Sequence, residues 1–183
     1  MARLFAAVIP PASVRTELAA LEEPLEGVRW TPEENLHLTL RFIGETGEEK
    51  AGRFAEALAA VRVEPFILPV GGAGLFPSRG PAHVLWVGTG HSHPRLFQLR
   101  QRVDEALLRV DLALDVRHFH PHLTIGRLTE QAAPKKIARW VEQQAGFEAP
   151  PFRVDAFHLV ASESVSGGPP HYRITRTFTL HKD

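Results

Sequence analysis

Two short stretches of the chain carry histidine and threonine at the same spacing. The first is His37–Leu40, with the sequence HLTL, and the second is His122–Ile125, with the sequence HLTI. Side chains alternate between the two faces of a β-strand, so in each stretch the histidine and the threonine would share one face while the apolar residues face a core. Each stretch therefore predicts an imidazole beside a hydroxyl on a rigid strand.

This combination of groups suits cleavage of a phosphodiester by in-line displacement. One group must take a proton from the attacking oxygen, and another must give a proton to the leaving oxygen on the far side of phosphorus. An imidazole, with an ordinary pKa of about 6.5, can do either job near neutrality, which makes His37 and His122 the catalytic candidates. The hydroxyls of Thr39 and Thr124 would donate hydrogen bonds to the non-bridging oxygens of the substrate. Neither role needs a metal.

Two arginines follow the motifs and are candidates for binding the phosphate. Arg41 comes four residues after His37 and would share its strand face, whereas Arg127 comes five residues after His122, the wrong parity for a regular strand. Gly126 precedes Arg127, and a bulge there would turn the arginine to the histidine face. A guanidinium makes bidentate contacts with phosphate, so both arginines are expected to bind substrate; a solvated surface position is the alternative for each.

Hydrophobic periodicity predicts alternating strands and helices along the whole chain. Stretches rich in glycine and proline predict two loops, Gly71–Pro81 and Ser162–Pro170, which could cover a substrate. The expected strands are Leu4–Ile9, Asn35–Ile43, Phe66–Val70, His83–Val87, His122–Leu128, Phe152–Ala161 and Tyr172–Leu180. The expected helices run from an N-cap at Ser13 to about Leu25, and over Glu48–Val61, Pro94–Val110 and Pro134–Ala145.

The order of these elements repeats along the chain. After each motif strand come a helix, a strand, a loop and another strand, with similar spacing. We interpret this as an internal duplication over approximately residues 35–90 and 120–181, joined by the long helix at 94–110. Two lobes related by a pseudo-two-fold axis would bring the two imidazoles to opposite sides of one cleft.

The composition limits the classes of function. The chain has 183 residues, 21 Lys and Arg against 21 Asp and Glu, and no cysteine. The lack of cysteine excludes thiol catalysis, disulfides and cysteine-ligated zinc. A net charge of zero argues against coating of long nucleic acids, so phosphate contacts should be local. The apolar run within Met1–Pro11 is too short for a signal peptide or a membrane span, and we expect a cytoplasmic monomer without a membrane partner.

The paired motifs resemble the HxTx motifs of the 2H phosphoesterases, and most closely those of the bacterial and archaeal RNA 2′,3′-cyclic phosphodiesterases, also called 2′-5′ RNA ligases. One such tetrapeptide is weakly specific, but two within a repeated framework are strongly specific. The resemblance covers almost the whole chain, including Arg3–Ala7, Trp30–Gly44, the Pro121-His122 junction with Arg127, and Tyr172–Leu180.

The resemblance implies a single bilobal α+β domain over residues 1–183. Two pseudo-symmetric lobes would each have an antiparallel sheet and flanking helices, with the active-site cleft between them. The implied activity is hydrolysis of an RNA 2′,3′-cyclic phosphate end to a 2′-phosphomonoester without metal or cofactor. His37 would be the proton donor and His122 the proton acceptor. Candidate substrates include tRNA halves and small cyclic nucleotides, with reversible 2′-5′ joining of RNA ends as a lesser activity.

Two alternatives to this interpretation stay open. The first is a non-catalytic protein that binds RNA ends or cyclic nucleotides on the same scaffold, although intact histidines and threonines in both motifs argue against it. The second is a metal site, because His118, His120 and His122 alternate along one predicted strand face. Pro121 interrupts that run.

The remaining aromatic and histidine residues have simpler expected roles. An aromatic residue in a strand packs in a core by default, and we expect this of Trp86; for Phe42 and Tyr172 we leave open whether they pack or stack on a nucleobase. His83 is expected in core or edge packing. The histidines expected to be structural or on the surface are His91, His93, His158, His171 and His181.

Overall fold

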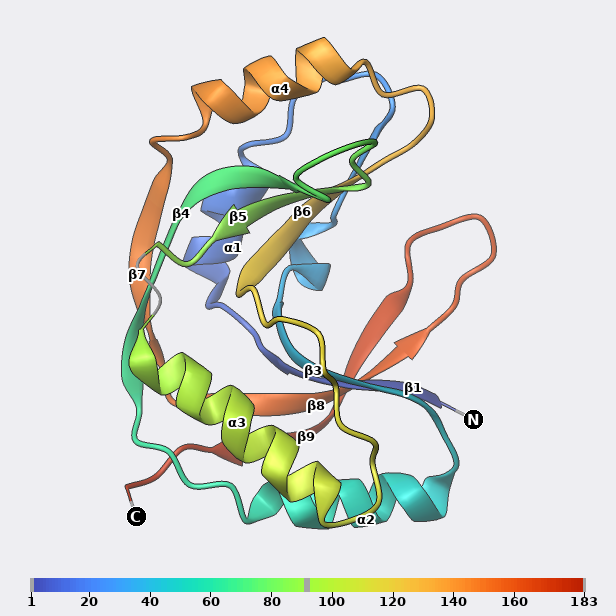
Figure 1. The fold of residues 1–183 in the computed structure, drawn as a ribbon, viewed down its shortest axis with the longest axis vertical. Coiled ribbons are helices and arrows are strands. Elements are labelled where there is room, and N and C mark those ends of the chain that lie inside the picture. Colours follow the sequence, from blue (N-terminus) through green and yellow to red (C-terminus); the bar gives the residue numbers. More distant parts are fainter. Residues whose placement is uncertain (1, 91–92, 183) are drawn as a thin grey trace.

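Nine strands form one antiparallel sheet in the computed structural model, which describes residues 2–90 and 93–182 (Figure 1). Eight strands follow the order β7-β4-β5-β6-β3-β1-β8-β9, and β2 pairs separately with β6. The strands are β1 (Ala2–Val8), β2 (Val28–Trp30), β3 (Leu38–Thr46), β4 (Phe66–Phe76), β5 (Val84–Gly88), β6 (His122–Leu128), β7 (Glu148–Val154), β8 (Ala156–Glu163) and β9 (His171–Thr179). The helices are α1 (Ala12–Ala19), α2 (Glu48–Ala59), α3 (Pro94–Leu108) and α4 (Pro134–Gln143), with a 3-10 turn at Glu33–Asn35.

The two motif strands meet in the middle of the sheet. β3 and β6 are joined by one paired position, Leu38 opposite Leu123. On one side of this pair lie β3, β1, β8 and β9, which we call the first lobe, and on the other lie β6, β5, β4 and β7, the second lobe. The expected α+β architecture with two related lobes is confirmed.

Each lobe is built from both halves of the sequence. β4 and β5 follow β3 along the chain but pair into the second lobe, while β8 and β9 follow β6 but extend the first lobe. The helices cross over in the same way, since α2 and α3 pack on the first lobe and α1 and α4 on the second. In Figure 1 the helices α2 and α4 lie at opposite ends of the molecule, with the motif strands between them.

The strands beside the motif strands show where the duplicated unit begins. β1 lies next to β3 in the sheet, and β5 lies next to β6 in the same way. We therefore infer that the first copy starts at β1 and includes α1, and that the second copy starts at β5 and includes α3. The predicted repeat over residues 35–90 and 120–181 leaves β1 outside both copies, places β5 in the first copy and uses α3 as the connection between them.

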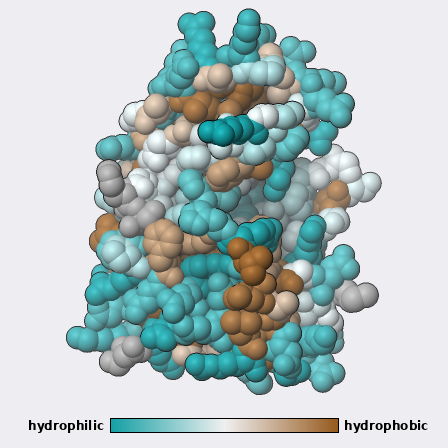
Figure 2. Space-filling view, in the orientation of Figure 1, coloured by the Kyte–Doolittle hydropathy of each residue, from teal (hydrophilic) through white to brown (hydrophobic). Residues whose placement is uncertain are grey.

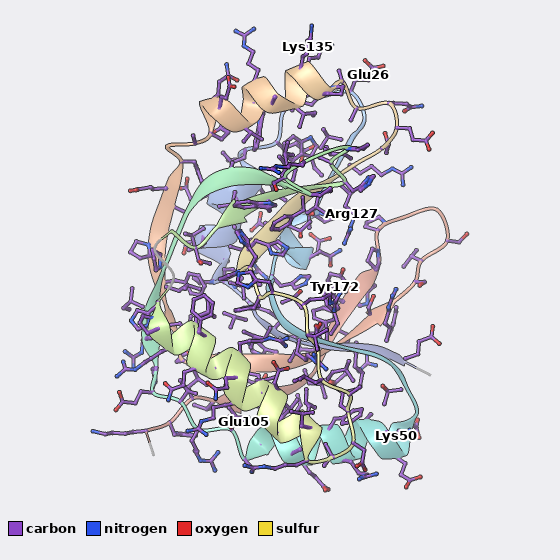
Figure 3. The ribbon with its side chains drawn as sticks, in the orientation of Figure 1. Glu26, Lys50, Glu105, Arg127, Lys135 and Tyr172 are labelled. Atoms are coloured by element: carbon purple, nitrogen blue, oxygen red, sulfur yellow. The ribbon has the colours of Figure 1, made fainter. Side chains whose placement is uncertain are left out.

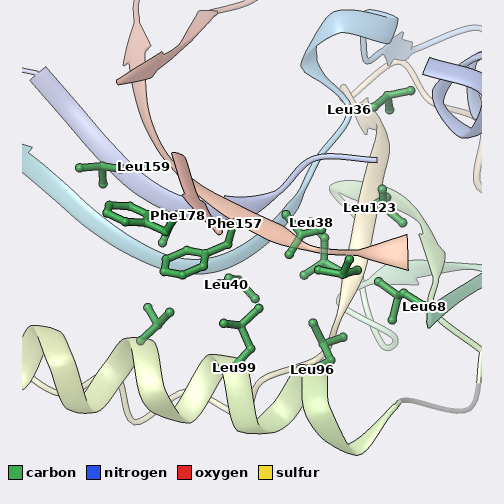
Figure 4. Close-up of a cluster of buried hydrophobic side chains, with 14 of the residues drawn as sticks. Leu36, Leu38, Leu40, Leu68, Leu96, Leu99, Leu123, Phe157, Leu159 and Phe178 are labelled. Carbon is green, nitrogen blue, oxygen red and sulfur yellow. The ribbon is translucent and has the colours of Figure 1, made fainter. Parts of the chain in front are cut away.

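The apolar side of the motif strands is buried in a core that continues under both lobes. Leu38 and Leu123 have no exposed surface, and Figure 4 shows Leu96 and Leu99 of α3 packed near Phe157 on this side of the sheet. Burial of each leucine stabilises the fold by about 1.5–3 kcal/mol. A one-residue slip of either motif strand would exchange these leucines for histidine and threonine, so the core fixes which residues face outward.

The glycine-rich stretch after Val70 is a strand, although a loop was predicted there. β4 continues to Phe76, which shortens the loop before β5 to residues 77–83. A Cβ added to Gly74 would lie 2.2 Å from the ring of Trp86. Glycine therefore serves here to let the indole lie flat on β4. The second loop is likewise shortened, to 164–170, because β8 continues to Glu163.

Other element boundaries differ from those expected. The first helix begins at Ala12 after Pro11 with no side-chain cap, so Ser13 is not its N-cap, and it ends at Ala19. The strand predicted over 152–161 is two strands, β7 and β8, separated at Asp155. The short strand β2 was not predicted, since three residues carry too little periodicity.

The molecular surface in Figure 2 is mainly hydrophilic, with an apolar strip over the connection between α3 and β6, where Leu114 and Val116 are exposed. No helix in the described part of the chain has the length and apolar character needed to cross a membrane.

Candidate active site

The histidines and threonines of both motifs lie on one face at the centre of the sheet. The paired leucines point into the core, so their neighbours along each strand point away from it. Counting outward from the leucine pair in an antiparallel register places His37 across from Thr124, and His122 across from Thr39. The histidines are then diagonal neighbours, which in a regular antiparallel pair lie about 7–8 Å apart, with somewhat closer Cβ atoms. The two imidazoles therefore face one common region of the sheet.

Each histidine is oriented by the same backbone hydrogen bond. The Nδ1 atom of His37 lies 2.7 Å from the carbonyl oxygen of Asn35, and the Nδ1 atom of His122 lies 2.7 Å from the carbonyl oxygen of His120. A carbonyl oxygen only accepts, so Nδ1 donates in both cases. The Nε2 atom of each ring is therefore the one available to exchange a proton with a substrate.

The surroundings of the two imidazoles favour their neutral form. Burial lowers the pKa of His37, the hydrogen bond to Asn35 opposes this, and the charges of His122 and Arg127 lower it further. Burial also lowers the pKa of His122, with the bond to His120 opposing and the charges of His120 and Arg127 adding to the effect. His37, His122 and Arg127 are thus close enough to affect one another, and a bound phosphate would shift both rings toward the charged form.

Aromatic side chains hold the ring of His37 on two sides. Phe5 of β1 lies 4.8 Å from it, centroid to centroid, and Tyr172 of β9 lies 5.1 Å away with its ring perpendicular. Tyr172 is half-buried, and it packs on Phe5 as well. These contacts restrict the imidazole to one orientation, and they give Tyr172 a packing role beside the site.

The ring of His122 has a similar aromatic wall. Phe76 at the end of β4 lies 4.9 Å from it and stacks on Trp86 at 5.1 Å. Trp86 pairs with Thr124 across β5 and β6, so it shares the face of the histidines and is half-buried. The expectation that Trp86 belongs to the core is therefore wrong. The default of core packing fails here because β5 alternates regularly, with Leu85 and Val87 buried and Trp86 on the opposite face.

Arg127 reaches the histidine face through a β-bulge. The register of β5 with β6 passes from Leu85–Gly126 to Trp86–Thr124 and leaves Ile125 unpaired between them. This extra residue reverses the parity, as Gly126 suggested, and the exposed Arg127 points to the same face as Thr124. Its charge acts on both catalytic candidates and on Tyr172. Figure 3 shows Arg127 and Tyr172 in the same central region of the molecule.

The first motif contains a matching bulge, which moves Arg41 away from the histidines. The register of β1 with β3 passes from Ala7–Thr39 to Ala6–Arg41 and leaves Leu40 unpaired. Arg41 therefore points to the core side, and Phe42 takes the place that Arg127 has in the second motif. Phe42 is 56% exposed and lies 6.2 Å from Phe5, so it is a solvent-facing aromatic rather than a core residue.

Arg41 is the centre of a buried ion cluster. Its side chain is 6% exposed, donates to the carbonyl of Ala113 and pairs with Asp104 at 3.5 Å and with Asp115 at 3.3 Å. Arg100 shares both aspartates. The prediction that Arg41 binds the substrate phosphate is wrong, because the bulge at Leu40 reverses the side-chain parity on which it depended.

The proposed metal ligands do not come together as a cluster. His118 and His120 are exposed, and the ring of His120 packs edge-on against Trp86 at 4.9 Å. Within residues 2–90 and 93–182 no group of three metal-ligating side chains is present. Of the other histidines, His158 is half-buried and bonded to Thr177 at 3.0 Å, and His91 lies outside the described residues.

Sequence reasoning missed Asn35 as part of the site. This buried residue offers its carbonyl to His37, and its side-chain amide donates to the carbonyl of Pro170 at 2.8 Å. It thereby connects the first histidine to the loop between β8 and β9. Only its position in the sequence could have identified Asn35, because the orienting carbonyl comes from the residue two places before each motif histidine, whatever its side chain.

One known protein family matches this chain over two successive stretches of the sequence. The family described as LigT-like phosphoesterase matches residues 8–86 and 88–171. Each matched stretch contains one of the two motifs. The first ends in β5 and the second begins at its end, which agrees better with a repeat starting near β1 and β5 than with the predicted boundaries.

Relatives from several organisms match over nearly their full length. An RNA 2′,3′-cyclic phosphodiesterase of Archaeoglobus fulgidus is 34% identical over 179 residues, covering 96% of this chain and 99% of the relative. One of Thermus thermophilus is 34% identical, covering 97% and 90%. Among solved structures, one from Thermus thermophilus has a TM-score of 0.83 at 26% identity, with 99% of each chain covered. The crystal structure of Escherichia coli LigT complexed with 3′-AMP has a TM-score of 0.77 at 27% identity, also over 99% of each chain.

Proposed function

Because this chain belongs to the LigT-like phosphoesterase family, we propose that it opens the 2′,3′-cyclic phosphate at an RNA end and leaves a 2′-phosphomonoester. The names of the relatives support this substrate. The observation that carries the proposal is the arrangement of His37 and His122 on one face around the leucine pair, each with Nδ1 bonded to a backbone carbonyl so that Nε2 is the nitrogen available to a substrate.

The two imidazoles would divide the proton transfers. Nε2 of His122 takes a proton from a water molecule as its oxygen bonds to phosphorus. The bond from phosphorus to O3′ breaks, and Nε2 of His37 gives its proton to that oxygen. Water is consumed, a 3′-hydroxyl is released, and proton exchange with solvent returns both rings to their starting states.

The remaining candidates would stabilise the charge that develops on the phosphoryl oxygens. Thr39 and Thr124 are half-buried beside the histidines, and their hydroxyls can donate to the two non-bridging oxygens. The guanidinium of Arg127 supplies a positive charge on the same face. Thr39, Thr124 and Arg127 stand on strands and His37 directly precedes β3, so little reorganisation is needed when the charge appears.

The same site would join RNA ends when a 5′-hydroxyl replaces water as the attacking group. O5′ would bond to phosphorus as O3′ leaves, which creates a 2′-5′ linkage. Water is far more concentrated than RNA ends, so we expect hydrolysis to dominate.

The test is product analysis on a short RNA with a 2′,3′-cyclic phosphate end, in the presence of EDTA. We expect a 2′-phosphomonoester, resolved from the 3′ isomer by chromatography against both standards. Loss of activity in EDTA would overturn the metal-free mechanism. Binding of the cyclic end without turnover would favour a protein that only binds RNA ends.

A further inference from the structure

A second arginine lies beside Arg127 on the same face of the sheet. Arg29 of β2 is the direct partner of Arg127 in the antiparallel pairing of β2 with β6. Directly opposed residues have side chains on one face, with Cβ atoms about 4.5–5.5 Å apart. The neighbour Trp30 points the other way and packs against Trp140 of α4 at 5.6 Å. Arg29 therefore shares the face that carries the histidines.

The pairing of Arg29 with Arg127 is unfavourable for folding. Like charges directly opposite one another in a sheet destabilise it. Both side chains are exposed, and among the residues that the structure describes neither forms an ion pair. Some other exposed arginines have a carboxylate partner, such as Arg173 with Glu163. An anionic ligand would relieve the repulsion between Arg29 and Arg127.

Both arginines are displaced along the sheet from the leucine pair. β2 pairs with β6 on the edge that β3 occupies at Leu123, and Arg29 faces Arg127 four residues beyond that leucine. The histidines, in contrast, adjoin the leucine pair itself. An anion held by Arg29 is therefore displaced along the strand from the phosphate between the histidines.

We propose that Arg29 binds the phosphodiester adjacent to the reacting phosphate, so that the site prefers the end of an RNA chain to a cyclic mononucleotide. This inference rests on the proposed function, whose substrate class it narrows. A guanidinium contacts a backbone phosphate without reading a base, so the preference is for chain length and not for sequence.

The experiment compares Arg29→Gln with the wild type on two substrates, uridine 2′,3′-cyclic phosphate and a hexanucleotide that ends in the same group. The matched control is Arg139→Gln, which removes an equal charge from an exposed position on α4, the helix on the opposite face. We expect Arg29→Gln to lower kcat/KM on the hexanucleotide by about 5- to 30-fold, mainly through KM, and to leave the mononucleotide unaffected. The salt dependence on the hexanucleotide should become shallower by about 0.7 in log–log slope.

A binding measurement separates this inference from the proposed function. Fluorescence anisotropy reports the affinity of each variant for a labelled hexanucleotide with a terminal phosphate, whether or not the protein turns over a cyclic end. Weaker binding by Arg29→Gln alone supports the phosphate contact even if hydrolysis is absent. Equal losses on both substrates, no loss on either, or the same loss in Arg139→Gln would each overturn it.

Discussion

Leu38 and Leu123, the second residues of the two motifs, lie directly opposite each other at the only paired position described between β3 and β6. Both are fully buried. The four polar residues of the motifs are the immediate neighbours of this pair on the other face. The distance between the two histidines is therefore set by one apolar contact in the core.

Replacement of Leu123 by alanine tests that dependence. The cavity should cost about 2–5 kcal/mol of unfolding free energy and loosen the contact between the motif strands, so kcat should fall even where the variant is fully folded. Leu58→Ala in α2 is the control, because that leucine is equally buried but remote from the motifs. Chemical denaturation and kcat below the unfolding transition give the two readouts. Equal kcat in both variants would contradict the positioning role.

Alanine at either motif histidine should lower kcat by about 10²- to 10⁴-fold with the fold preserved. A substrate with sulfur in place of O3′ has a leaving group that needs less protonation. We therefore expect it to restore activity to His37→Ala, the proton donor variant, and not to His122→Ala. Rescue of His122→Ala alone would reverse the assignment of donor and acceptor. Circular dichroism and thermal unfolding check that both variants fold.

The pH dependence of the reaction follows from the half-buried imidazoles of His37 and His122. One ring must be charged and the other neutral, which gives a bell-shaped profile, and burial lowers the pKa of both rings from about 6.5. The optimum of kcat/KM should therefore lie on the acid side of that value. The negative charge of a bound substrate favours the charged imidazole and so raises its pKa in the complex. Since kcat reports the complex and kcat/KM the free enzyme, the basic limb of the kcat profile should lie at higher pH than that of kcat/KM. Coinciding limbs would contradict the role of the phosphate charge.

The same shifts predict how stability changes with pH. Below about pH 6.5 the unfolded chain takes up protons that the half-buried rings of His37 and His122 resist, so the free energy of unfolding should fall as the pH falls toward their folded pKa values. The double variant His37→Gln/His122→Gln should show a shallower decrease over this window. Denaturation at a series of pH values measures both slopes.

Arg41→Met should affect stability rather than chemistry. It leaves the partly buried Asp104 with Arg100 alone and Asp115 with Arg100 and Arg117, which should cost about 3 kcal/mol. Because Arg41 points away from the histidines, kcat should change little at temperatures where the variant is folded. A large loss of kcat in a folded Arg41→Met protein, together with normal kcat in Arg41→Lys, would show that Arg41 contributes to catalysis after all.

Gly74→Ala tests the aromatic wall of His122. The added methyl group would collide with the indole of Trp86, so we expect about 1–3 kcal/mol of destabilisation and a shift in tryptophan fluorescence. Displacement of Trp86 should also disturb Phe76 and lower kcat. Gly52→Ala in α2, where a new Cβ meets nothing within 4 Å, serves as the control. Unchanged fluorescence in Gly74→Ala would show that the indole does not depend on the glycine.

The amino-acid sequence by itself determined the motif strands, the faces of their histidines and threonines, and the α+β class. These features follow from the local alternation of side chains along a strand. Thr39 lies between two leucines, and Thr124 lies between a leucine and an isoleucine, so the apolar neighbours fix which face is buried. The glycine before Arg127 also marked the bulge that turns this arginine. Membership of a duplicated family could be anticipated because both motifs are intact.

Only the tertiary structure decided which side chains beyond the motifs reach the histidine face. No glycine adjoins Leu40 in the sequence to indicate a bulge there. The bulge nevertheless places Phe42 rather than Arg41 on the histidine face. Arg29 lies opposite Arg127 because of the register in which β2 pairs with β6, two strands about a hundred residues apart in the sequence. Alternation along a strand is a local property of the backbone, whereas bulges and register are set by packing between distant segments, which no single stretch of sequence contains.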